Sequence, residues 1–142
     1  MSPTISGTQP STLHSRSVTS TGRYWIGDKY SSFKIGDEVS KYRLDVAGYS
    51  GDAGDALQYE GDLNGNGKFG LYFHSGMKFS NHDQDNDNSN INCAEARSGG
   101  WWYNSCMSAC LTCKTYYYEW RRPAKVGARE LVVASRMLMK PQ

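Results

Sequence analysis

The amino-acid sequence predicts a loop-rich β fold in a single domain, and three features of its 142 residues indicate this. Fifteen glycines and ten tyrosines are more typical of strands joined by loops than of a helical bundle. Tyr42, Leu44 and Val46 alternate with polar or small residues, which is the period of a half-buried strand. Two Asn-Gly pairs within residues 64–67 are strong turn signals. The length is sufficient for one domain with a modest core.

The first third of the chain divides into a leader and two strands. Residues 1–22 carry Ser, Thr and Pro without periodicity, so we expect a disordered leader followed by a domain over residues 23–142. A short strand through residues 30–35 ends at a Gly-Asp pair. The alternating strand around Leu44 then leads into a loop over residues 48–54, which three glycines punctuate.

The remainder of the chain is mostly loop. A hairpin is predicted over residues 59–79, around the Asn-Gly pairs. Residues 81–92 are almost wholly polar and cannot contribute to a core. Leu131–Val133 is the one late strand that the pattern predicts. Among the aromatic residues, we expect at least two of Trp101, Trp102 and Tyr103 to lie in the core, because buried aromatics contribute large apolar areas.

Composition excludes several protein classes and indicates a compartment. The formal net charge of +2 gives no strong attraction to nucleic acid or acidic membranes. No apolar run approaches the roughly 18–20 residues that a membrane span needs. Residues 1–22 lack the apolar segment of a signal peptide, yet four cysteines within residues 93–113 favour an oxidising compartment. We therefore expect a truncated or partial product of a secreted protein.

The polar loop is a candidate calcium site. Asp83, Asp85 and Asp87 are spaced by two, and carboxylates that close repel one another unless a cation or solvent screens them. Calcium accepts six to eight oxygen ligands from carboxylates, backbone carbonyls and water. An EF-hand is excluded because its twelfth position, counted from Asp83, is Ala94. The alternative is a solvated polar loop without metal, and a second, weaker candidate at residues 62–67 is better explained as a hairpin.

The four cysteines leave more than one interpretation open. A disulfide between Cys93 and Cys106 would hold the polar loop against a tryptophan-rich segment, and would stabilise the fold by about 3 kcal/mol. Cys110 and Cys113 form a C-x-x-C pair. This pair fits a second disulfide, a redox motif or half of a zinc site. The separation of Cys93 and Cys106 is unlike that of a zinc knuckle, and no βαβ pattern surrounds the C-x-x-C pair.

Several sequence blocks between residues 28 and 113 occur together in a recognisable order and spacing. They are Tyr30–Glu38, Lys41–Leu44, Gly48–Asp55, Gly76–Ser80, Asp83–Asp87, Asn92–Ala94 and Gly100–Cys106. These blocks resemble the C-terminal part of fibrinogen-like domains, as found in fibrinogen, ficolins, tachylectins and angiopoietins. The resemblance implies an α+β fold, a twisted antiparallel sheet with long loops, with a calcium loop and a binding pocket at one end. Here the domain is expected to be truncated.

The resemblance also implies a set of site residues in the polar loop. In that family two carboxylates and two backbone carbonyls bind calcium ahead of a disulfide. Carried over position by position, the calcium ligands are Asp85 and Asp87 by side chain, and Ser89 and Ile91 by carbonyl. The disulfide implied in the same way joins Cys93 to Cys106.

A ligand pocket beside the calcium loop follows from the same resemblance. The peptide bond before the second cysteine is typically cis in the family, which here is the bond between Ser105 and Cys106. Met107 replaces the usual His or aromatic residue, and Arg97 replaces a Tyr or Asp. Met107 forms no strong hydrogen bond, whereas Arg97 makes the pocket cationic. An anionic sugar or a protein carboxylate suits this pocket better than a neutral acetyl sugar.

The sequence therefore predicts a calcium-dependent, lectin-like module that recognises glycans or acetylated groups outside the cell, in innate immunity or a related role. The alternative is an extracellular protein-interaction module without sugar binding. A thiol or zinc protein using Cys106, Cys110 and Cys113 is a third hypothesis. No nucleophile–base pair or phosphate loop is present, so an enzyme is not expected. Oligomers are usual in the family, through segments upstream of this domain.

Overall fold

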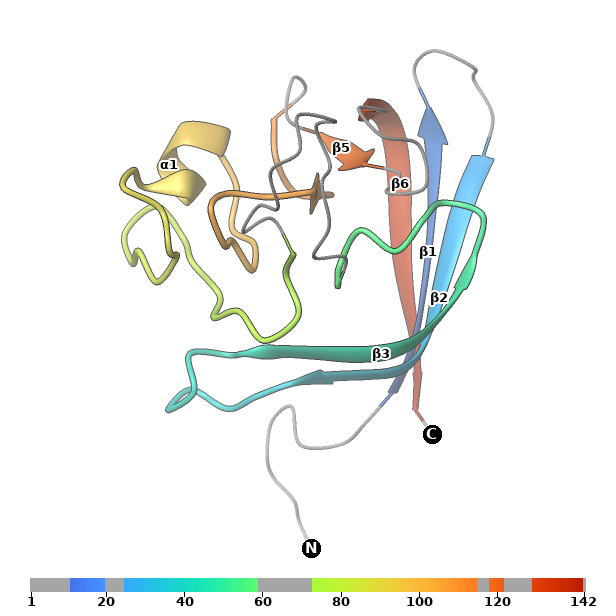
Figure 1. The fold of residues 1–142 in the computed structure, drawn as a ribbon, viewed down its shortest axis with the longest axis horizontal. Coiled ribbons are helices and arrows are strands. Elements are labelled where there is room, and N and C mark those ends of the chain that lie inside the picture. The colour runs from blue at the N-terminus through green and yellow to red at the C-terminus, as the bar shows by residue number, and fades with distance from the viewer. Residues whose placement is uncertain (1–10, 20–24, 59–72, 115–117, 122–128, 142) are drawn as a thin grey trace, which may run out of the picture.

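The computed structural model describes residues 11–19, 25–58, 73–114, 118–121 and 129–141. Six strands and one short helix lie in these ranges. They are β1 Ser11–Thr19, β2 Trp25–Ile35, β3 Leu44–Gly51, α1 Cys93–Arg97, β4 Ala109–Cys110, β5 Glu119–Arg121 and β6 Arg129–Pro141. The strands form one antiparallel sheet in the order β3-β2-β1-β6-β5-β4. Figure 1 shows the sheet strongly curved, with α1 and the long loops gathered inside the curve.

The alternation that predicted a strand around Leu44 is confirmed in β3. Leu44 and Val46 are buried, whereas Asp45 and Ala47 between them are exposed. In β2 the predicted strand of residues 30–35 is longer than expected and begins at Trp25. The glycines at 48 and 51 were expected to lie in a loop, and this is wrong, because both continue β3 with positive φ angles.

The expected disordered leader over residues 1–22 is wrong for Ser11–Thr19, which forms β1 in the middle of the sheet. β1 pairs with β2 on one side and with β6 on the other. The inward side chains after Leu13 are polar, so the strand lacks the apolar alternation by which strands are recognised. One of them, Ser15, donates a hydrogen bond of 2.6 Å to Asp28 on β2. The ordered domain therefore begins well before residue 23.

The last strand is also longer than its sequence signal. Leu131–Val133 was expected, and β6 extends from Arg129 through the methionine-rich end to Pro141. Because β6 pairs with β1 along its length, backbone hydrogen bonds hold residues that have few apolar contacts. The hairpin predicted over residues 59–79 lies outside the described residues as far as residue 72, and residues 73–79 form an irregular loop with a turn at Ser75 and Gly76.

The core is dominated by aromatic side chains from the loop region. Trp101, Trp102 and Tyr103 are all buried, as expected. Trp101 and Trp102 meet edge to face with ring centroids 5.1 Å apart, and Phe33 of β2 meets Trp102 in the same way at 6.4 Å. These contacts join the loops to the inner face of the sheet. No helix within the described ranges is long and apolar enough to cross a membrane.

Candidate functional site

The polar loop places two carboxylates next to one another at its centre. The backbone N–H of Asp87 donates to Oδ1 of Asp85 at 3.2 Å. The carboxylate of Asp87 in turn accepts hydrogen bonds from the N–H groups of Ser89 at 2.9 Å and Cys93 at 3.0 Å. Asp87 thus connects the loop to the first residue of α1, and Asp85 lies on the exposed side.

The two carboxylates repel each other. Partial burial raises the pKa of Asp87, and the neighbouring Asp85 raises it further through its charge, while the N–H groups of Ser89 and Cys93 act in the opposite direction. A divalent cation between the two side chains would remove this repulsion. Burial is the main cause of the raised pKa of Asp87, and the charge of Asp85 is a smaller one.

The donor set of this loop fits calcium. Carboxylate and carbonyl oxygens are the ligands that calcium prefers. Among the backbone hydrogen bonds of the described residues, none ends on the carbonyl oxygen of Ser89 or Ile91. The same ranges contain no cluster of three or more His, Cys, Asp or Glu suited to a metal. A calcium ion here would consequently depend on Asp85 and Asp87 together with backbone carbonyls and water.

The polar loop is connected by hydrogen bonds to the segment that precedes the second cysteine. Asn88 makes two hydrogen bonds to Asn104, one through its backbone N–H at 3.1 Å and one through its side-chain amide at 2.9 Å. Asn104 is fully buried, and its own amide donates to the carbonyl of Phe73 at 3.0 Å. Its backbone N–H donates to the carbonyl of Cys106 at 2.8 Å. These hydrogen bonds connect the loop to residues 104–106.

The disulfide between Cys93 and Cys106 makes a covalent connection in the same place. It is present in the structure, as the family resemblance implied. The Ser105–Cys106 peptide bond is cis. The start of α1, the end of the polar loop and the predicted ligand segment therefore meet at one buried disulfide.

The structure separates the four predicted ligand-binding residues into two groups. Cys106 and Met107 are buried, and Sδ of Met107 lies 3.9 Å from Sγ of Cys113. Ser105 and Arg97 are partly exposed, with Arg97 in the last turn of α1. Arg97 and Ser105 are consequently the two of these residues that can present side-chain groups to a ligand.

Tyr103 occupies the space between Arg97 and the second cysteine pair. Its hydroxyl donates to the carbonyl of Gly99 at 2.6 Å and lies 3.1 Å from Sγ of Cys113. Burial raises the pKa of this hydroxyl, and the positive charge of Arg97 partly opposes that effect. The side chain of Tyr103 therefore lies in the interior between the carbonyl of Gly99 and the second cysteine pair, and remains neutral.

The second cysteine pair is a disulfide between Cys110 and Cys113. Of the three interpretations of the C-x-x-C pair, a disulfide is the one observed, and it excludes the zinc interpretation. All four cysteines lie in the described residues and none is free, which removes the thiols that a zinc site would need. The disulfide closes a tight loop at the edge of β4.

One residue that sequence reasoning missed organises this region. His74 is fully buried; its Nδ1 lies 2.8 Å from the carbonyl oxygen of Trp102, and its Nε2 accepts from the N–H groups of Ser108 and Ala109 at 3.0 and 3.2 Å. This arrangement requires the neutral tautomer with the proton on Nδ1. Burial lowers the pKa of His74 to about 4, which keeps the ring neutral. Its partners are backbone groups far along the chain, so no local sequence motif predicts its role.

A pocket of about 350 Å³ lies on the other side of the loop. It is lined by polar and small residues from the start of the loop and from α1: Asn81, His82, Ala94, Glu95, Ser98 and Gly99. Asn92 donates from its side chain to the carbonyl of His82 at 3.0 Å, which fixes the loop wall. This pocket does not include the four predicted ligand-binding residues.

Comparison with known proteins decides the family. A profile of the fibrinogen beta and gamma chains, C-terminal globular domain, matches residues 18–128. The chain belongs to this family. The match includes the polar loop and both disulfides, and it confirms the resemblance drawn from the sequence blocks.

The relatives and solved structures agree on the family and the fold. Fibrinogen-like protein 1 of Rattus norvegicus is 37% identical over 138 residues, which cover 78% of this chain and 43% of the relative. The fibrinogen alpha chain of the same species is 47% identical over 90 residues, covering 61% of this chain and 11% of the relative. This chain therefore spans less than half the length of these relatives.

Two solved structures confirm the fibrinogen-like fold. Lamprey fibrin D-dimer, complexed with the peptide ligand Gly-His-Arg-Pro-amide, superposes with a TM-score of 0.74 and 27% identity, over 94% of this chain and 46% of that one. The fibrinogen-like globe domain of human ANGPTL6 superposes with a TM-score of 0.70 and 25% identity, over 95% of this chain and 58% of that one. The predicted twisted antiparallel sheet with long loops is therefore confirmed as a fibrinogen-like fold.

Proposed function

We propose that this chain is a calcium-dependent extracellular recognition module that binds a protein or peptide and performs no catalysis. Calcium is held by the carboxylates of Asp85 and Asp87 and the carbonyls of Ser89 and Ile91. The observation that carries this proposal is the direct connection from the carboxylate pair to the disulfide, through the hydrogen bond from Cys93 to Asp87. Two disulfides suit an extracellular location.

Calcium acts in this proposal by ordering the ligand site. The hydrogen bonds between Asn88 and Asn104 couple the loop to the segment that ends at Ser105 and Cys106. When calcium neutralises Asp85 and Asp87, their repulsion disappears and the loop loses its tendency to open. The ligand surface beside Ser105 and Arg97 then keeps one geometry, which lowers the entropy cost of binding.

A carboxylate-bearing peptide or protein is the ligand class that the partly exposed Arg97 favours. Arg97 supplies a guanidinium at the end of α1, and this group forms strong paired hydrogen bonds to carboxylates. Met107 is buried and offers no strong hydrogen bond to a neutral sugar. The lamprey structure with a bound peptide supports peptide recognition by this fold. Recognition of glycans or acetylated groups remains the second candidate, and the cationic Arg97 favours acidic sugars within that class.

Calcium titration by calorimetry tests the first part of the proposal. We expect saturable binding of one ion, and about 2.7 kcal/mol of added stability at a calcium concentration one hundred times the Kd. Asp85→Asn with Asp87→Asn keeps the shapes of the side chains, removes their charges and should abolish binding. Asp83→Asn is the control within the same loop, and should preserve it. Absence of saturable binding, or equal loss in the control, would overturn the calcium assignment.

Ligand classes are separated by screening the calcium-loaded protein against peptides with free carboxylates and against acidic and N-acetylated glycans. We expect peptide binding that EDTA reverses and that Arg97→Gln weakens, while Lys78→Gln, an exposed charge elsewhere, leaves it unchanged. Calcium-dependent binding confined to glycans would replace the peptide proposal with the lectin one.

A further inference from the structure

The sheet has a second face, which points away from the core and the calcium loop. Along β1, Leu13 and Ser15 are buried, while His14 and Arg16 between them are exposed. Successive side chains of a strand point to opposite faces, so His14 and Arg16 lie on the outer face. Side chains directly opposite them on β2 and β6 lie on the same face.

This outer face collects basic side chains from three neighbouring strands. His14 lies opposite Lys29 of β2, and Arg16 lies opposite Arg136 of β6. Lys140 lies further along β6, two residues beyond Leu138, which is opposite His14. We call His14, Arg16, Lys29, Arg136 and Lys140 the basic face. Four of these five side chains carry a full positive charge at neutral pH.

No ion pair within the described residues involves the basic face. Residues directly opposite on antiparallel strands have Cβ atoms about 4.5–5.5 Å apart, and like charges there are destabilising. Among the residues that the structure describes, one ion pair is present, between Lys34 and Asp45 at 3.8 Å, and it does not involve the basic face. The whole chain carries a net charge of only +2, so this is a local concentration of charge.

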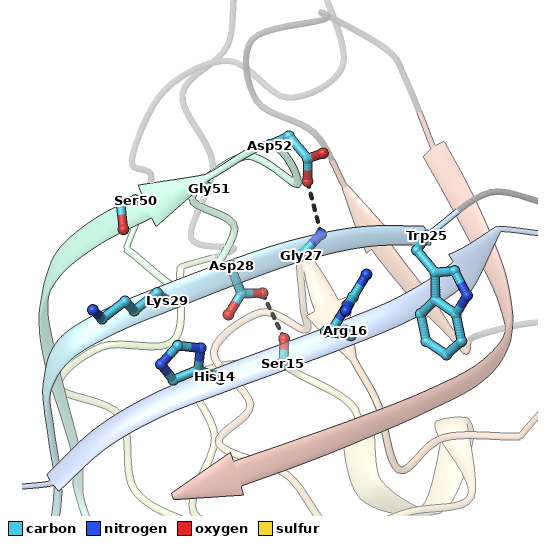
Figure 2. Close-up of a pocket in the computed structure, with 10 residues that line it drawn as sticks. All are labelled: His14, Ser15, Arg16, Trp25, Gly27, Asp28, Lys29, Ser50, Gly51 and Asp52. Atoms are coloured by element: carbon cyan, nitrogen blue, oxygen red, sulfur yellow. Dashed lines mark hydrogen bonds between the residues drawn. The ribbon is translucent and has the colours of Figure 1, made fainter. Parts of the chain in front are cut away.

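An exposed tryptophan lies beside these charges. Trp25 at the start of β2 is 48% exposed, and the guanidinium carbon of Arg16 is 5.3 Å from the centre of its ring. Together with Lys29 and His14 they line a hollow of about 470 Å³, whose lining also includes Asp28 and Asp52. Figure 2 shows the side chains of Trp25, Arg16, His14 and Lys29 following the two strands along this hollow.

From these observations we infer that the outer face of β2, β1 and β6 binds a sulfated polysaccharide. The basic face provides cations on a rigid grid, since neighbouring strands are about 4.8 Å apart, and a linear polyanion lying across it meets several of them at once. Trp25 provides a flat apolar surface for a sugar ring, which a purely electrostatic site lacks. Disulfides indicate an oxidising environment, where acidic polysaccharides are the polyanions in reach.

The site is separate from the calcium loop, so it can be tested independently. A heparin octasaccharide is the probe, and its affinity for the full chain is measured by calorimetry over a range of salt concentrations. We expect binding that weakens steeply with salt, because exposed charges are screened. EDTA should leave it unchanged, which distinguishes this inference from the proposed calcium-dependent function.

Variants assign the binding to the basic face. Arg16→Gln with Arg136→Gln should weaken heparin affinity at least about tenfold and flatten its salt dependence, since two charges are lost. Arg43→Gln with Lys78→Gln removes the same charge from positions outside this face and should leave affinity nearly unchanged. Trp25→Ala should weaken binding while leaving the salt dependence as it is. Far-UV circular dichroism confirms that each variant is folded.

Four outcomes would overturn the inference. The first is no heparin binding even at low ionic strength, and the second is equal weakening by the control pair. The third is equal affinity for chemically desulfated heparin, which would remove the role of sulfate. The fourth is tighter binding to duplex DNA or to phosphatidylserine vesicles than to the octasaccharide, which would assign the basic face to another polyanion.

Discussion

Protonation of the buried His74 should destabilise the folded protein. The ring bridges three backbone groups, since Nδ1 donates to the carbonyl of Trp102 and Nε2 accepts from Ser108 and Ala109. A proton on Nε2 would face two N–H donors and convert both hydrogen bonds into repulsions. Burial therefore holds the pKa of His74 at about 4, below its ordinary value of 6.5.

The size and direction of the effect follow from this difference in pKa. Because the folded pKa lies below the unfolded one, the unfolded chain binds the proton first as the pH falls. The stabilisation is complete above pH 6.5 and is lost as the pH falls toward 4. Between pH 7 and pH 5, His74 should lower the free energy of unfolding by about 2 kcal/mol.

Asp28 opposes this loss over the same pH range. Burial raises its pKa to about 7 from 3.8, with the charge of Asp55 adding to the effect and hydrogen bonds from Ser15 opposing it. A raised folded pKa gives stability that is complete below 3.8 and lost as the pH rises through 7. Lowering the pH from 7 to 5 should thus raise the contribution of Asp28 to the free energy of unfolding by about 2 kcal/mol. This gain conceals the effect of His74 in the unaltered chain.

Urea unfolding followed by tryptophan fluorescence at pH 7 and pH 5 separates the two groups. In Asp28→Asn the free energy of unfolding should fall by about 2 kcal/mol on acidification, and in His74→Gln it should rise by a similar amount. Differences between pH values are compared within each variant, so a general loss of stability cancels. If His74→Gln and the unaltered chain share one pH dependence, the argument for a neutral, bridging imidazole is wrong.

Two further predictions concern the disulfides and one strand glycine. Replacing Cys93 and Cys106 by Ala should cost about 3 kcal/mol in urea unfolding, and replacing Cys110 and Cys113 about 2 kcal/mol, because the smaller loop restricts the unfolded chain less. Equal costs would show that chain entropy is not the main contribution. Gly48→Ala should destabilise the protein by more than about 1 kcal/mol, measured by its Tm, since φ is +72° and a Cβ would overlap the side chain of the opposite strand. An unchanged Tm would contradict this.

The parts of the fold that the sequence predicted are those with a local signal. Leu44 and Val46 alternate in the sequence because one face of β3 is buried, and the same pattern is visible without the structure. β1 has no such signal, since Ser17 and Thr19 point inward where apolar residues are expected. Its place is set by pairing with β6, at the opposite end of the chain, which no window of neighbouring residues can reveal.

The residues of the candidate site likewise divide into those with a local sequence signal and those without one. Asp85 and Asp87 are recognisable as candidate ligands because the carboxylates of a calcium site can lie close together in the chain. The pairing of Cys110 with Cys113 remained open because disulfide, redox and zinc sites share that spacing. His74 was missed because its hydrogen bonds reach backbone atoms at residues 102, 108 and 109, and backbone atoms have no sequence signature.

The pairing of β1 with β6 means that the sheet cannot be completed until β6 has been synthesised. Ribosomes add about 5–20 residues per second, so β1 waits on the order of ten seconds before β6 has been synthesised. During that interval β1 has an open edge toward its missing neighbour, a position that invites contacts with other chains. Ser15, Ser17 and Thr19 make the waiting strand a poor partner for such contacts, because aggregation favours apolar segments. The polar interior of the central strand therefore protects the nascent chain until its last strand closes the sheet.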